Sequence, residues 1–208
     1  VISNGTTLLD AGALDSGVAT GAMTLIKELT ASSSATLSFV HGSSSVVFDG
    51  TYPIYVFKFT NIHPATYQAK FTFQADTSTN TNYNQTMTTT WFYAGYHKED
   101  GSGGSSGYFG DADQAQGTSF QNLTWSMDNG NDDNCNGTLT LFNPSSTTFI
   151  KHFMCNTQFN YGVSGDATEL VHCSGYFNIT DAINKIQFKM SSGNIDAGTI
   201  KMYGIKDS

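Results

Sequence analysis

The clearest structural signal in the chain is the run Ile183-Asn-Lys-Ile-Gln-Phe-Lys-Met-Ser-Ser-Gly-Asn-Ile-Asp-Ala-Gly-Thr-Ile-Lys-Met-Tyr-Gly-Ile-Lys206. Ile186, Phe188 and Met190 alternate with polar residues, and Ile200 and Met202 do the same after a turn-rich gap. A period of two places each apolar set on one face of a β-strand. Glycine and asparagine in the gap accept the positive φ of a turn at low cost. We therefore expect a β-hairpin with one solvated and one buried face, forming a paired edge of a sandwich.

The same alternation recurs upstream between turns rich in Gly, Asn, Asp and Ser. Further expected strands cover residues 23–29, 36–40, 45–48, 52–62, 66–75, 86–96, 118–127, 137–142, 147–155 and 169–177. Residues 36–40 and 45–48 flank a four-residue turn and predict a hairpin. The apolar run 52–62 suits a central strand covered on both faces. Pro53 belongs at its beginning, because proline cannot donate to an interior ladder.

The number and spacing of these strands predict the fold class. About ten short strands separated by turn signals are typical of a sandwich or barrel. Their number and length favour an all-β, antiparallel, jelly-roll-like β-sandwich. Residues 17–28 offer a short helix as an alternative, which Thr20, Gly21 and Thr24 disfavour.

A chain of 208 residues predicts one domain. We expect residues 18–208 to form a single β-sandwich domain. Residues 1–17, which hold Leu8, Leu9 and Leu14 among small residues, are expected to be an N-terminal arm or docking segment. Residues 97–117 contain few large apolar side chains and are expected to form the largest loop.

The charge composition limits the classes of partner. Charged residues make up 12% of the chain, against roughly 25% in an ordinary protein. All cations are Lys, and the formal net charge is −8. Nucleic-acid binding needs Lys and Arg on phosphates and bases, so we expect no nucleic-acid partner, and an anionic membrane is disfavoured too. No apolar run approaches the roughly 18 residues of a membrane span, so no membrane insertion is expected. The uncharged polar surface suits sugars or other protein subunits.

The densest acidic segment is Asp128-Asn-Gly-Asn-Asp-Asp-Asn134. Its carboxylate and amide oxygens are ligands that Ca²⁺ prefers, but the full calcium-loop pattern is absent. The same composition is typical of a solvated turn, which is the interpretation we adopt. Asp111 and Asp113 form a weaker pair of the same kind. We therefore expect no metal site.

The three cysteines are Cys135, Cys155 and Cys173. Their odd number and wide spacing argue against a disulfide framework. Cys155 and Cys173 lie in expected strands, where they are either bridged or, as we expect, buried free thiols. Cys135 follows a polar segment and is expected to be exposed. No Cys/His spacing typical of a metal site occurs.

The titratable residues form no catalytic pattern. The histidines are His41, His63, His97, His152 and His172. A catalytic histidine needs a nucleophile or further ligands beside it, and no HExxH or GxSxG motif occurs. Glycan-cleaving enzymes need paired acids, whereas Glu occurs only at Glu28, Glu99 and Glu169. We expect no catalytic residue, no cofactor and no enzymatic activity.

Aromatic residues cluster around the Gly-rich segment 101–107. They are Trp91, Phe92, Tyr93, Tyr96, Tyr108 and Phe109. Exposed rings among polar neighbours stack on sugars or anchor protein interfaces. The alternative is core packing, because half of an alternating strand must point inward.

The amino-acid sequence of the C-terminal run also resembles that of a known class of proteins. The pattern Ile-x-Phe-x-x-Ser-Ser-Gly-Asn-x-x-Ala-Gly-Thr-x-x-x-Tyr-Gly-Ile is similar to the C-terminal strands of structural proteins of tailed bacteriophages, many from marine phages. These are capsid decoration, head-fibre and tail-fibre proteins. The resemblance extends upstream to Leu37-Ser-Phe-Val and Tyr55-Val-Phe-Lys-Phe-Thr-Asn-Ile-His-Pro64. It carries over no catalytic or binding residue.

The resemblance implies a non-enzymatic virion structural protein on the exterior surface of the particle. Such a subunit acts by assembly with other capsid or tail proteins and with itself, most simply as a homotrimer. The alternative is a carbohydrate- or receptor-binding β-sandwich at a fibre tip, which recognises a host-surface glycan through the aromatic cluster.

Overall fold

The computed structural model describes residues 23–97, 104–162 and 167–206, together with four two-residue strands nearer the N-terminus. These form two separate pairs, β1 (Ile2–Ser3) with β2 (Thr6–Thr7), and β3 (Leu9–Asp10) with β4 (Ala13–Leu14). The remaining residues of the expected arm 1–17 lie outside the described residues, so its docking role stays a prediction.

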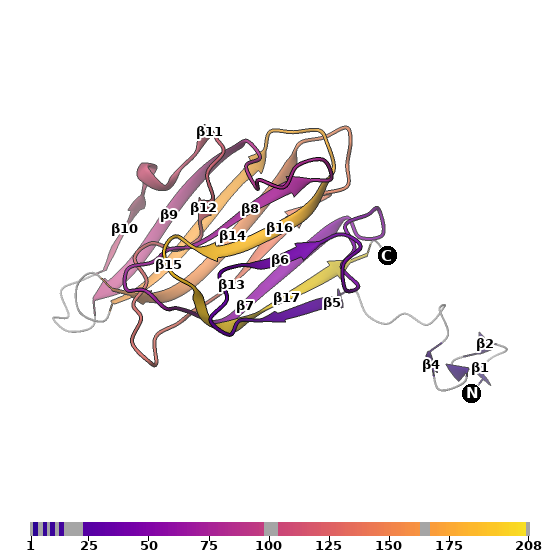
Figure 1. Cartoon of the computed structure of the whole chain (residues 1–208), viewed down its shortest axis with the longest axis horizontal. Coiled ribbons are helices and arrows are strands. Elements are labelled where there is room, and N and C mark those ends of the chain that lie inside the picture. The colour runs from indigo at the N-terminus through magenta and orange to yellow at the C-terminus, as the bar shows by residue number, and fades with distance from the viewer. Residues whose placement is uncertain are drawn as a thin grey trace.

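Two antiparallel sheets packed face to face make up the body of the protein (Figure 1). The larger sheet has nine strands in the order β10-β9-β15-β14-β13-β7-β17-β5, with β11 also paired to β9. These strands are β5 (Met23–Thr30), β7 (Ile54–Pro64), β9 (Met87–His97), β10 (Ser105–Tyr108), β11 (Ala115–Gly117), β13 (Cys135–Phe142), β14 (Lys151–Tyr161), β15 (Ala167–Phe177) and β17 (Ile195–Ile205). The smaller sheet has four strands in the order β12-β8-β16-β6, namely β6 (Leu37–Val40), β8 (Phe71–Thr77), β12 (Gln121–Asn122) and β16 (Ile183–Met190). The expected all-β antiparallel sandwich is confirmed.

The chain passes repeatedly from one sheet to the other. β5, β7, β13 and β17 of the larger sheet alternate along the chain with β6, β8, β12 and β16 of the smaller one. Such alternation between two sheets is the connectivity of a jelly roll. β9, β14 and β15 instead extend one side of the larger sheet, and β10 forms its edge (Figure 1). This extension carries both surfaces described in the next subsection.

The expected C-terminal hairpin is wrong in its pairing, although both of its strands exist. β16 pairs with β8 and β6 in the smaller sheet, whereas β17 pairs with β7 and β5 in the larger one. The two strands therefore face each other across the interior of the sandwich and are not an edge. The physical reason is that alternation fixes which face of a strand is apolar but not which strand becomes its neighbour.

The link between β16 and β17 is held by hydrogen bonds to the segments that precede β8 of the smaller sheet and follow β5 of the larger sheet. Ser191 donates its backbone N–H to the carbonyl of Lys70 at 2.9 Å, and its hydroxyl accepts from the Lys70 N–H. On the other side Asn194 donates its side-chain amide to the Ser33 carbonyl at 2.9 Å. Gly193 in this link has φ +68°, which glycine adopts without strain. The turn residues recognised in the sequence thus form a crossing between sheets.

The core between the sheets is rich in phenylalanine. Phe188 of β16 is fully buried, and its ring lies 5.3–6.3 Å from five other phenylalanine rings. These belong to Phe39, Phe57, Phe59, Phe71 and Phe73. Edge-to-face and offset contacts of this kind add to the hydrophobic gain of burial. Phe188 is therefore a central packing residue of the sandwich.

The hairpin expected around residues 41–44 is also wrong. β6 pairs with β16, and no strand forms over residues 45–48. Val46 and Phe48 are nevertheless buried. The backbone N–H of Phe48 donates to Nδ1 of His41 at 2.9 Å. This hydrogen bond holds the segment in place without strand pairing. The apolar pattern of residues 45–48 therefore indicates buried side chains and does not indicate a paired strand.

Three further expectations need correction. The expected strand 66–75 begins only at Phe71, after Gln68 turns the chain with φ +61°, and both faces of β8 are buried. The central position of β7 between β13 and β17 is confirmed, but its outward face is covered only in part, because Val56 is buried and Lys58 is exposed. The expected loop 97–117 instead contains β10, a 3-10 turn at Gly110–Ala112 and β11.

The helical alternative for residues 17–28 does not hold where the chain is described, because β5 begins at Met23. No helix in the described part of the chain is long and apolar enough to cross a membrane.

Candidate functional site

The extension of the larger sheet carries a pocket on its inner face, with a volume of about 280 Å³. We call it the aromatic pocket. Its walls are the rings of Trp91, Tyr93, Phe109, Trp125 and Tyr161 and the carboxylate of Glu169. Gly95, Tyr96 and Thr168 also line it. The pocket therefore combines a largely aromatic wall with one acidic group.

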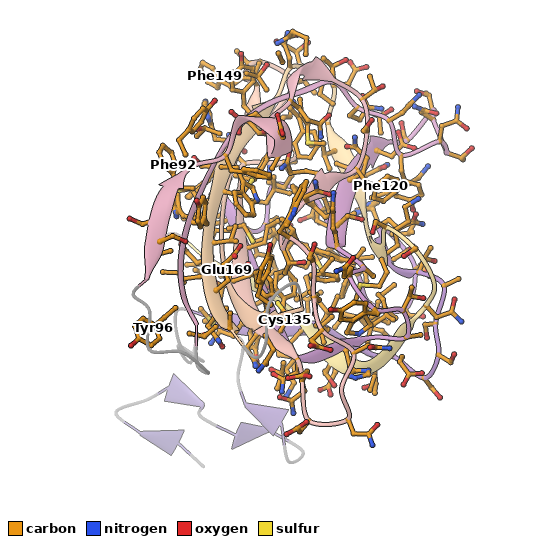
Figure 2. All side chains as sticks on the ribbon, turned by 90° about the vertical axis from the view of Figure 1, so that its left-hand side faces the viewer. Phe92, Tyr96, Phe120, Cys135, Phe149 and Glu169 are labelled. Carbon is orange, nitrogen blue, oxygen red and sulfur yellow. The ribbon has the colours of Figure 1, made fainter. Side chains whose placement is uncertain are left out.

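Strand alternation and register place these groups together. Trp91, Tyr93 and Gly95 are the inward residues of β9, and Glu169 of β15 lies directly opposite Gly95 in the register. A Cβ on Gly95 would lie 3.8 Å from Oε2 of Glu169. Because glycine has no side chain, the carboxylate borders open space at this point. Figure 2 shows Phe92, the outward neighbour of Trp91, on the opposite side of the sheet from Glu169.

The aromatic wall is fixed by contacts among its members. The ring of Phe109 lies 4.6 Å from that of Trp125 and 5.5 Å from that of Trp91, both measured between centroids. The indole N–H of Trp91 donates to the carbonyl of Asn122 at 3.2 Å, and the Phe109 N–H donates to the Trp91 carbonyl. These contacts hold Trp91, which is almost fully buried, at the base of the pocket.

Charges near the pocket are of both signs. The ammonium of Lys70 lies 3.3 Å from the ring centroid of Trp125, which is a cation–π contact. Burial lowers the pKa of Lys70. Glu169 is only 9% exposed. Burial, and after it the charge of Glu169, raises the pKa of Tyr161. The pocket thus contains a desolvated carboxylate beside a phenol that stays protonated at neutral pH.

The expected aromatic cluster is split between two surfaces. Trp91, Tyr93 and Phe109 point inward to the pocket, whereas Phe92 and Tyr108 point outward with their ring centroids 5.5 Å apart. Tyr96 lies at the end of β9 opposite Thr168 and borders both surfaces. Core packing is therefore confirmed for the buried Trp91, whereas Phe92, Tyr96 and Tyr108 are exposed and their binding role stays a prediction.

Sequence reasoning missed three residues of the pocket. Trp125, Tyr161 and Glu169 are distant in sequence from the aromatic cluster. The pairing of β15 with β9 and of β14 with β15 brings Glu169 and Tyr161 to it. No sequence signal specifies that register. Trp125 had a signal, since a tryptophan in a polar segment needs a packing partner.

Among the described residues of β9, β14 and β15, the outward-facing ones on the outer face include no Lys, Asp or Glu. We call this surface the outer patch. It consists of Thr88, Thr90, Phe92 and Ala94 of β9, His152, Met154, Asn156 and Gln158 of β14, and Leu170, His172, Ser174 and Tyr176 of β15. Phe92, Met154 and Leu170 are 45%, 46% and 51% exposed. A hollow of about 430 Å³ between His152, Ser174 and Tyr176 indents the patch.

The remaining outer face of the larger sheet is charged. Lys201 of β17 pairs with Glu28 of β5, with Nζ 3.5 Å from Oε2. Lys58 of β7 is exposed, and its ammonium lies 5.3 Å from the ring centroid of Tyr203. The absence of charge is therefore a property of the extension and not of the whole sheet.

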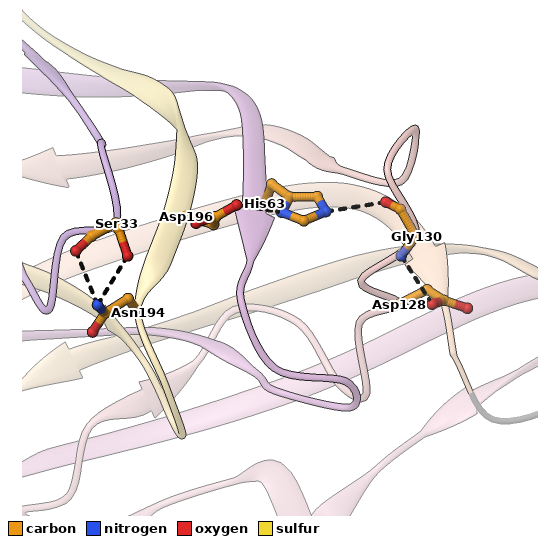
Figure 3. A network of polar contacts seen from close by, with 6 residues as sticks. All are labelled: Ser33, His63, Asp128, Gly130, Asn194 and Asp196. Carbon is orange, nitrogen blue, oxygen red and sulfur yellow. Dashed lines mark hydrogen bonds and ion pairs between the residues drawn. The ribbon is translucent and has the colours of Figure 1, made fainter.

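The acidic segment 128–134 forms a turn. Oδ1 of Asp128 accepts the backbone N–H groups of Asn129 and Gly130, which is the hydrogen bonding of an Asx turn. The carbonyl of Gly130 lies 3.0 Å from Nε2 of His63, whose Nδ1 is 3.7 Å from a carboxylate oxygen of Asp196 (Figure 3). Among the described residues, no group of three His, Cys, Asp or Glu side chains is placed to hold a metal ion. The solvated-turn interpretation agrees with this arrangement.

The three cysteines are all buried free thiols. The expectation that Cys135 is exposed is wrong, because it opens β13 on the inner face, where the polar loop has already ended. Cys155 and Cys173 lie opposite each other in the register of β14 and β15 and are not bridged. Burial raises the pKa of all three thiols. The expected free thiols at Cys155 and Cys173 are confirmed.

The histidines have separate surroundings. His172 hydrogen-bonds through Nδ1 to the side chain of Asn156 at 2.7 Å on the outer patch. His152 packs near the ring of Tyr176, with centroids 5.7 Å apart. The side chain of His97 lies outside the described residues. His152 and His172 both lie on the outer patch, where each has a different partner.

Comparisons with models of protein families, with curated proteins and with solved structures found no match.

Proposed function

We propose that this protein is a non-enzymatic structural subunit of the exterior surface of a virion, and that copies of it assemble through the outer patch. The observation that carries the proposal is the combination of exposed apolar side chains and missing charge on that patch. The resemblance of the C-terminal run to phage structural proteins supports the virion as its location.

The net negative charge of the chain favours an interface on the uncharged outer patch. Copies with a net charge of −8 repel each other. A contact through the outer patch buries no Lys, Asp or Glu of that patch, so the patch itself contributes no unpaired charge to the interface. Interface cores are depleted in charged residues and enriched in aromatic residues and Met, as the patch is at Phe92, Tyr176 and Met154. Its occupant is therefore a second copy of this chain, within a cyclic oligomer such as a trimer.

The described carboxyl groups at the aromatic pocket also agree with a non-enzymatic role. Glycosidases of the common type use two carboxyl groups roughly 5–10 Å apart. Glu169 is the one carboxylate among the described residues that line the aromatic pocket. The pocket has the composition of a binding site, and its described lining residues include no second acid for such hydrolysis.

A matched pair of surface variants tests the assembly. Leu170 in the outer patch is 51% exposed, and Leu25 on β5 of the same sheet is 49% exposed. We expect Leu170→Lys to reduce the molar mass in solution to that of the 22.4 kDa chain, because it buries an unpaired ammonium in each contact. Leu25→Lys should leave the oligomer intact. Light scattering after size-exclusion chromatography measures both, and equal effects of the two variants would refute the outer patch as the interface.

The virion location has its own test. Antibodies raised against the purified chain should label the outside of intact phage particles from the source sample in electron micrographs. Labelling of host cell debris alone would contradict the location while leaving the assembly interface untouched.

A second candidate function is carbohydrate binding, which fits a subunit that meets a host surface. The observation that favours it is the aromatic pocket with its single carboxylate. Aromatic rings offer flat apolar faces, and polar groups at their borders fix the orientation of a ligand.

A further inference from the structure

We propose that Asn129, in the acidic segment 128–134, is a site of spontaneous conversion to aspartate and isoaspartate. Asn129 is followed by Gly130, so its side-chain amide lies next to the backbone nitrogen of a residue without a side chain. In this conversion that nitrogen attacks the amide carbon and closes a succinimide ring. Glycine favours the step, because it has no Cβ to hinder the approach and its backbone adopts more conformations. The proposal concerns the covalent state of the turn and goes beyond the proposed assembly.

The structure leaves the reacting groups of this pair free to meet. Asn129 and Gly130 are half-buried and lie outside the strands, so no ladder fixes their backbone. Among the described residues, none forms a hydrogen bond with the side-chain amide of Asn129. The Gly130 N–H donates to Oδ1 of Asp128, with 3.3 Å between nitrogen and oxygen. The attacking nitrogen therefore lies beside a carboxylate that can accept its proton as a general base.

The conversion consumes one water molecule and releases one ammonia molecule. The Gly130 nitrogen forms a bond to Cγ of Asn129, while its proton passes to Asp128. The C–N bond of the side-chain amide then breaks, and the amide group takes the bonding electron pair and the proton from Asp128 and leaves as ammonia. Water opens the succinimide at either of its two carbonyl groups. One opening gives aspartate, and the other gives isoaspartate, in which the backbone runs through the former side chain.

A second Asn-Gly pair of the described chain, Asn136-Gly137, is held in the opposite way. It lies within β13, and Gly137 is paired in register with both neighbouring strands, β7 and β14. Oδ1 of Asn136 accepts the backbone N–H of Asn61 at 2.9 Å. Ring closure would break this hydrogen bond and bend an interior strand, leaving backbone groups without partners. The fold therefore protects Asn136, although its local sequence is equally reactive. A third pair, Asn4-Gly5, lies outside the described residues.

Conversion of Asn129 changes the contacts of the turn. The Gly130 carbonyl accepts the backbone N–H of Asp133 and lies 3.0 Å from Nε2 of His63 (Figure 3). Isoaspartate lengthens the backbone directly before Gly130 and so displaces this carbonyl. Either product also adds a carboxylate next to Asp128, in a chain whose net charge is already −8. We therefore expect the converted protein to be more acidic, with its turn displaced from His63.

Peptide mass spectrometry of the full chain, incubated at neutral pH, measures the conversion. Chymotrypsin cleaves after Trp125 and Phe142, so a single peptide carries both described Asn-Gly pairs and provides its own control. Electron-transfer fragmentation distinguishes aspartate from isoaspartate. A sample digested before incubation corrects for conversion during digestion. The same chain unfolded in urea gives the rates that the local sequence alone produces.

In the folded chain we expect Asn129 to convert at least about tenfold faster than Asn136, which corresponds to about 1.4 kcal/mol in activation free energy. In urea the two should convert at similar rates. Similar rates at the two sites of the folded chain, or conversion of Asn129 only after unfolding, would overturn the proposal. Neither outcome depends on the oligomeric state, so this test can fail while the proposed assembly stands.

The variant Asp128→Asn tests the proton acceptor. It keeps a side-chain oxygen that accepts the N–H groups of Asn129 and Gly130, but it removes the base. We expect conversion of Asn129 to slow by about tenfold or more. An unchanged rate in a variant with a native near-ultraviolet circular dichroism spectrum would overturn the role of Asp128. Should the variant fail to fold, the comparison of Asn129 with Asn136 in the unmodified chain decides the proposal.

Discussion

Replacing Phe188 with alanine should remove a large part of the stability of the fold. Phe188 is fully buried and contacts five phenylalanine rings that come from both sheets. Truncation of a buried Phe to Ala costs about 3–5 kcal/mol, because transfer free energy is lost and a cavity is left. A tightly packed site with five ring contacts belongs at the upper end, since each aromatic pair adds about 0.5–1.5 kcal/mol to the area term. Total stabilities are only about 5–15 kcal/mol, so the loss is decisive.

Urea unfolding followed by circular dichroism measures this loss. The control is Phe149→Ala, because Phe149 is 69% exposed and its truncation should change the free energy of unfolding by no more than about 0.5 kcal/mol. Both variants must be compared at one protein concentration, since assembly adds to the apparent stability. If Phe188→Ala cost less than about 1 kcal/mol, the placement of β16 in the middle of the smaller sheet would be wrong. A strand in a solvated edge hairpin would give that small value.

Three further predictions concern backbone, ionisation and thiols. Gly198→Ala should lower the free energy of unfolding by more than about 1 kcal/mol, because φ is +111° and an added Cβ would lie 2.5 Å from the Asn61 carbonyl oxygen. Gly50→Ala is the control and should be nearly neutral, because an added Cβ would lie in open space. Thermal unfolding measures both variants. Burial raises the pKa of Tyr55 to about 12, so its neutral form stabilises the fold fully below pH 10.0 and this contribution is lost as the pH rises towards 12. Tyr55→Phe should remove a step near pH 12 from the absorbance titration at 295 nm and flatten that pH dependence, and an unchanged titration would contradict the assignment. The three thiols should react with a thiol reagent only at the rate of unfolding, and rapid labelling of the native chain would refute their burial.

The sequence predicted the fold class well because alternation is a local property. Ile186, Phe188 and Met190 had to face an apolar environment, and the structure buries all three. The partner strand could not be predicted in the same way. A hairpin and a crossing between sheets need the same turn residues, and the choice depends on contacts of Ser191 and Asn194 with residues more than a hundred positions away.

The candidate site could be predicted only in part for a related reason. The aromatic cluster was visible in the sequence, but alternation sends Trp91 and Phe92 to opposite faces of β9. Glu169 and Tyr161 reach the pocket through the register of two strand pairs, which composition and spacing do not encode. Cys135 was misjudged because the polar turn ends one residue before it.

The most direct test of the central claim is the molar mass of the unmodified chain in solution, measured by light scattering over a range of concentrations. Assembly through the outer patch predicts a defined multiple of 22.4 kDa, with a threefold mass for the expected trimer. A mass of one chain at every concentration would contradict the claim that this protein acts by assembling with copies of itself.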